Sequence, residues 1–128
     1  MQITLFLKRV LLLDAASCLG MGAMLIFGAE LLSGPLGLPA ALLTGAGGAL
    51  LPIGLYIGWL GLRLNAPVFL VWLVVAGNLA WVAESLYLAF SDPRITPLGI
   101  AFVTSQAAIV LVLAILEYSG MRRAEAAA

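Results

Sequence analysis

Residues 68–90 read VFLVWLVVAGNLAWVAESLYLAF, an apolar run whose only charged residue is Glu84. At about 1.5 Å per residue a helix of this run is roughly 34 Å long. The hydrocarbon core of a bilayer is about 30 Å thick, so the helix is long enough to cross it with modest tilt. The run therefore predicts a membrane-spanning helix.

The composition of the whole chain agrees with that prediction. The 128 residues are 64% hydrophobic and 9% charged, with a mean hydropathy of +1.18. A soluble domain of this size carries about 25% charged residues, which it needs to cover its water-facing surface. We therefore expect residues 1–128 to form a single transmembrane domain whose exterior mostly faces lipid.

Clusters of helix-breaking residues divide the chain into four apolar segments. Breaks at 33–39, 63–67 and 91–97 leave predicted spans at about 10–32, 40–62, 68–90 and 98–118. The connections are too short to hold a soluble domain, so neighbouring spans must be antiparallel. The expected fold class is all-α, an integral membrane four-helix up-down bundle. Asp14 interrupts the first apolar run after four residues, which is typical of a retained helix rather than a cleaved signal.

The basic residues predict an orientation. Five of the six fall on one side of the predicted membrane and only Arg94 falls on the other; the five are Lys8, Arg9, Arg63, Arg122 and Arg123. The side rich in Lys and Arg is usually cytoplasmic, so both termini are expected there.

Several functions are disfavoured by residue counts. The chain has no histidine, and Cys18 is its only cysteine, so no disulfide within the chain and no pair of cysteines for a metal or redox site is available. The formal net charge is zero, without the basic tract that nucleic acid would require. No nucleophile and base can be paired, so we expect no enzyme, no metal and no cofactor.

Small residues mark one face of the second predicted span. Gly47, Gly54, Gly58 and Gly61 fall within about 60° of one another at about 100° per residue. Such a face lets helix backbones approach closely. It predicts either packing inside the bundle or contact with a second copy or another subunit.

Polar residues inside the spans are the remaining candidates. Asn78, Glu84 and Ser85 in the third span lie at depths similar to that of Gln106 in the fourth. We predict a hydrogen-bonded cluster of these four residues, which either fixes helix register or lines a polar cavity.

Asp14, Arg63 and Glu117 are expected near the cytoplasmic boundary, as members of a charge-neutralising ring with Arg122. A proton or cation site at Asp14 is the alternative interpretation.

The segments 77–85 (GNLAWVAES), 98–103 (LGIAFV) and 116–118 (LEY) resemble those of small bacterial four-helix inner-membrane proteins without assigned activity. The resemblance covers the four-span layout and implies a bacterial inner membrane, but no mechanism.

Three functions remain open. The leading prediction is a non-catalytic accessory, assembly or stabilising subunit that acts through helix–helix contacts, as a homo-oligomer or within a larger membrane complex, with membrane lipid as its other partner. The alternatives are a small oligomeric transporter or channel that uses Glu84, Asn78 and Gln106, and a lipid- or pigment-binding subunit.

Overall fold

The computed structural model describes residues 1–127, and these residues contain five helices. They are α1 (Leu5–Phe27), α2 (Ala29–Leu36), α3 (Ala40–Gly61), α4 (Val68–Ser91) and α5 (Pro97–Ala127). All except α2 are long and apolar enough to cross a membrane. The prediction of a helical chain with four long apolar helices is confirmed.

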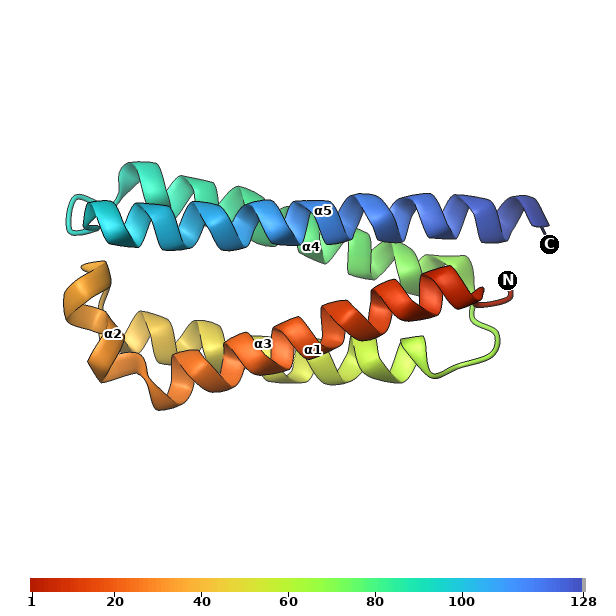
Figure 1. Cartoon of the computed structure of the whole chain (residues 1–128), viewed down its shortest axis with the longest axis horizontal. Coiled ribbons are helices and arrows are strands. Elements are labelled where there is room, and N and C mark those ends of the chain that lie inside the picture. The colour runs from red at the N-terminus through yellow and green to blue at the C-terminus, as the bar shows by residue number, and fades with distance from the viewer. Residues whose placement is uncertain (128) are drawn as a thin grey trace.

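The long helices run in alternating directions, and the two ends of the chain lie at the same end of the molecule (Figure 1). α1 packs along α3 and also contacts α5, while α4 packs along α5. α3 and α4 are consecutive in the chain but barely touch. The order around the bundle is therefore α3, α1, α5, α4, and the ring is open between α3 and α4.

The first and last helices differ from the predicted spans. α1 begins five residues before the expected boundary and ends at Phe27, and α2 follows it after Gly28. Pro35 lies inside α2, one residue from its end, and because it has no N–H it removes one backbone hydrogen bond from this short helix. α5 continues nine residues beyond the expected end at Tyr118. Because α1 starts earlier and α5 ends later, Asp14 and Glu117 lie farther from their helix ends than expected.

The glycine face of α3 lies against α1. A Cβ atom placed on Gly47 would lie 2.6 Å from the carbonyl oxygen of Gly22, so the two backbones are in direct contact there. Gly54 and Gly61 similarly face leucine side chains of α1, and Gly58 faces Ala15. This face is therefore covered inside the chain.

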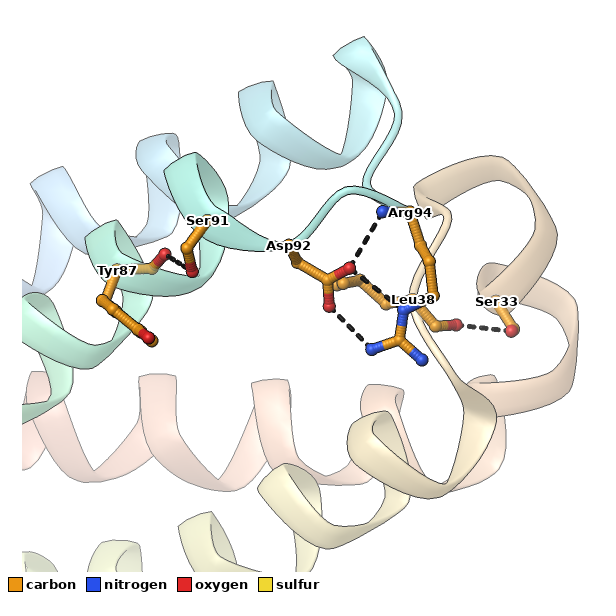
Figure 2. A network of polar contacts seen from close by, with 6 residues as sticks. All are labelled: Ser33, Leu38, Tyr87, Ser91, Asp92 and Arg94. Atoms are coloured by element: carbon orange, nitrogen blue, oxygen red, sulfur yellow. Dashed lines mark hydrogen bonds and ion pairs between the residues drawn. The ribbon is translucent and has the colours of Figure 1, made fainter.

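Each end of the bundle is closed by backbone contacts. Gly37 ends α2 with φ of +70°, and a Cβ atom there would lie 2.2 Å from the carbonyl oxygen of Arg94. Beside it, Arg94 forms an ion pair of 2.7 Å with Asp92, and the Ser33 hydroxyl donates to the carbonyl of Leu38 at 2.5 Å (Figure 2). At the other end, the N-terminal residues pair with the α3–α4 loop, since Ile3 N–H donates to the carbonyl of Leu64 at 2.9 Å.

Candidate functional site

A buried polar group joins three helices. The Asn78 side-chain amide on α4 donates to Asp14 Oδ2 on α1 at 2.8 Å and to Glu117 Oε1 on α5 at 2.7 Å. Asp14 is 1% exposed and Glu117 is fully buried. We refer to Asp14, Asn78 and Glu117 as the carboxyl–amide triad.

The three residues meet because they lie at the same level of the bundle. Asp14 is nine residues after the start of α1, Asn78 is ten after the start of α4, and Glu117 is ten before the end of α5. All three helix ends lie at the end of the molecule that carries the termini (Figure 1). At about 1.5 Å per residue, each side chain lies about 14 to 15 Å from that end.

The triad is short of hydrogen-bond donors. The Cys18 thiol, one turn along α1, donates to Asp14 Oδ1 at 3.6 Å, so both Asp14 oxygens have a partner. Glu117 Oε2 is buried without one. A buried polar atom without a partner is rare in native proteins and is costly in lipid, because water cannot compensate for it.

The predicted charge-neutralising ring of Asp14, Arg63, Glu117 and Arg122 is wrong in both of its arginines, since neither forms an ion pair within residues 1–127. The two acids are neighbours, but Arg63 is exposed, donates to the carbonyl of Asn65 at 3.1 Å and lies 4.9 Å from the centre of the Trp59 ring. The physical reason is helix length. α1 begins earlier and α5 ends later than expected, which places both acids well inside the bundle and leaves Arg63 beyond the end of α3.

The predicted cluster of Asn78, Glu84, Ser85 and Gln106 is divided in the structure. Gln106 donates to Ser85 Oγ at 2.9 Å, but its carbonyl accepts from the Trp81 indole N–H at 2.8 Å. Asn78 belongs instead to the triad. Trp81 is thus part of this second polar group.

Glu84 faces outward from α4. It is exposed, and no hydrogen bond or ion pair joins its side chain to another residue within 1–127. Asn78, Trp81 and Ser85 point inward, and Glu84 lies to one side of that face.

Two cavities lie along the gap between α3 and α4, and Trp81 lines both. The upper cavity, nearer α2, has a volume of about 290 Å³, with Glu84, Ser85 and Gln106 on a wall that is otherwise apolar. The lower cavity, of about 340 Å³, is lined by Cys18, Tyr56 and Asn78 among apolar side chains. We call these two cavities together the lateral groove. Asn78 of the carboxyl–amide triad lines the lower cavity, and Glu84 lines the upper one.

This arrangement suits binding more than bond-breaking chemistry. The groove offers an apolar surface and a few fixed hydrogen-bonding groups, which is the usual composition of a ligand pocket. The triad offers a neutral amide and two carboxyl groups, and the carboxyl groups can hold a proton.

The sequence contained a signal for the triad that we did not use. Asp14 and Cys18 are four residues apart and so share a helical face, and Glu117 is the single acidic residue of the predicted span at 98–118. Depths counted from the correct helix ends would have aligned Asp14 and Glu117 with Asn78.

Family models, curated proteins and solved structures were all compared with this chain, and none of them matches it.

Proposed function

We propose that this protein is a multi-pass membrane protein without enzymatic activity that binds an amphiphilic molecule from the lipid phase in the lateral groove. The observation that carries the proposal is the opening between α3 and α4, with cavities of about 290 and 340 Å³ along it. Pockets for small molecules typically have volumes of about 300 to 1,000 Å³.

The walls of the groove favour an amphiphile over a purely polar solute. Most lining side chains are leucine, methionine, phenylalanine and similar apolar groups. In a membrane this opening faces the acyl chains, so an apolar body can enter sideways without crossing water. Ser85 and Glu84 line the upper cavity, where the hydroxyl and the carboxyl can bind a hydrogen-bond donor or a cationic head group.

Filling the groove with a large side chain tests this function. Ala46 lines the upper cavity, whereas Ala108 is exposed on α5 and lines neither cavity, so Ala46→Trp and Ala108→Trp form a matched pair. We expect native mass spectrometry from gentle detergent to find a bound amphiphile on the wild type and on Ala108→Trp. The amount on Ala46→Trp should fall at least fivefold.

Equal amounts of bound lipid on all three proteins would contradict the proposal, because lipid around the outer surface is insensitive to the groove. Both variants must first elute as single species with unchanged helical content.

A second candidate function is the accessory subunit predicted from the sequence. The observation that favours it is Glu84, an exposed carboxyl on a membrane-spanning helix, since acidic side chains within spans usually have a partner. A partner helix with a basic or amide side chain would satisfy it. In the same mass spectra, a protein partner that is lost in Glu84→Gln, with no bound amphiphile, would favour this function.

We further propose that the protein lies in a bacterial inner membrane with both termini in the cytoplasm. In a Cys18→Ala background, a membrane-impermeant maleimide should label Ser91→Cys in intact cells and Glu125→Cys only after lysis. The reverse pattern would contradict the orientation.

A further inference from the structure

The carboxyl–amide triad contains acidic groups without a basic partner. Asp14 comes from α1, Glu117 from α5 and the neutral Asn78 from α4. The titratable group of α3 that lines the same cavity as Asn78 is Tyr56, and its hydroxyl donates to the carbonyl of Leu70 at 2.9 Å. Within residues 1–127, the one ion pair joins side chains of the α4–α5 turn, at the far end of the bundle.

The basic residues at the end of the bundle that carries the termini do not reach the triad. The guanidinium of Arg63 lies over Trp59 and that of Arg123 lies over Phe6, at 4.9 and 5.5 Å from the ring centres. The others at this end are Lys8, Arg9 and Arg122, none of which forms an ion pair within the described part of the chain. The charge of the acids is therefore not balanced by the protein.

The two carboxyl groups are also too close for both to be charged at low cost. Asp14 Oδ2 and Glu117 Oε1 accept from the same nitrogen atom, at 2.8 and 2.7 Å, so these oxygens cannot be farther apart than the two distances added together. Two neighbouring carboxylates in a site of low polarity repel each other, and the usual solution is one shared proton.

A shared proton also accounts for the oxygen that has no partner. Two ionised carboxylates have only acceptor atoms and cannot form a hydrogen bond with each other. A proton on Glu117 Oε2 turns the unpartnered acceptor into a donor, and the neighbouring Asp14 carboxylate can accept from it. We propose that Asp14 and Glu117 together bind one proton, shared between their carboxyl groups. The Asn78 amide stabilises the remaining negative charge by donating to both groups.

The proton site borders the lateral groove. Asn78, a member of the triad, and Cys18, whose thiol donates to Asp14, both line the lower cavity of the groove. This inference concerns the triad itself and does not depend on which molecule occupies the groove.

Infrared difference spectroscopy on the full-length protein in lipid tests the proposal, since a protonated carboxyl has a carbonyl stretch that an ionised one lacks. We expect the wild type at neutral pH to show such a band and to lose it in alkali. Glu117→Gln and Asp14→Asn should each abolish the band. Glu84→Gln, which changes an exposed acid on α4, should keep it unchanged.

Both triad variants preserve the size of the side chain, and the new amide of Glu117→Gln can still donate to Asp14, so the fold should survive. If either variant does not fold, the pH titration of the carbonyl band in the wild type still tests the proposal. Absence of the band at neutral pH would overturn the proposal, as would its persistence in either triad variant. A band that disappears when sodium is added at constant pH would show a cation site instead and would also overturn it.

Discussion

Replacing Asn78 with leucine is the most direct test of how the helices are held together. Leucine is similar in size to asparagine but has no polar atoms, so Asn78→Leu keeps the packing and removes two hydrogen bonds at once. The change leaves Glu117 without any hydrogen-bond donor from α4. Besides the proton proposed to be shared with Glu117, Asp14 keeps the Cys18 thiol, a weak donor.

The expected cost follows from the number and setting of these bonds. Hydrogen bonds between membrane helices are worth about 0.6 kcal/mol on average and up to about 2 kcal/mol each, so the loss of two predicts about 1 to 4 kcal/mol. Both acceptors belong to carboxyl groups buried in the bundle, which places the expected value in the upper half of this range. The bond to Asp14 also joins α4 to α1, a pair of helices with no close backbone contact. The loss should therefore loosen α4 selectively.

The assay is reversible unfolding in mixed micelles, in which SDS is titrated and helical content is followed by circular dichroism. Ser85→Ala is the control, since it removes one acceptor from Gln106, whose amide still donates to the carbonyl of Val103 at 2.8 Å. This control should cost less than about 1 kcal/mol. An Asn78→Leu protein within about 0.5 kcal/mol of the wild type, well below the predicted loss, would refute the reasoning. So would a Ser85→Ala protein destabilised as much as Asn78→Leu.

Two further predictions concern other parts of the bundle. Gly47→Ala should destabilise the protein by about 1 to 3 kcal/mol, because the new Cβ meets the carbonyl oxygen of Gly22 at 2.6 Å, whereas Gly48→Ala points into open space and should be neutral or slightly stabilising in the same SDS titration. The hydrogen bonds from Arg94 lower the pKa of Asp92 to about 2 from its ordinary 3.8, so the folded state holds this proton less tightly than the unfolded state. The contribution of Asp92 to stability should therefore be complete above about pH 4 and disappear as the pH falls through about 2. In Asp92→Asn, this part of the pH dependence of thermal unfolding should be missing, and an unchanged profile would contradict the assignment.

The middle of the chain was the most predictable part of the fold. The spans expected at about 40–62 and 68–90 correspond to helices at Ala40–Gly61 and Val68–Ser91. Each is bounded by proline, and hydropathy is a local property, so the composition of a segment is enough to locate it. The ends of the chain were harder to predict, because α1 and α5 extend past the apolar core into polar residues that hydropathy does not count as part of a span.

By itself, the sequence determined the number of long apolar helices and the small residues available for a close helix contact, because both depend on composition and on the period of the helix. Only the tertiary structure decided which polar groups meet. Partner choice depends on the order of the helices around the bundle and on their relative depth, and neither follows from periodicity. Asn78 thus pairs with Asp14 and Glu117 rather than with Gln106, and the gap between α3 and α4 remains open.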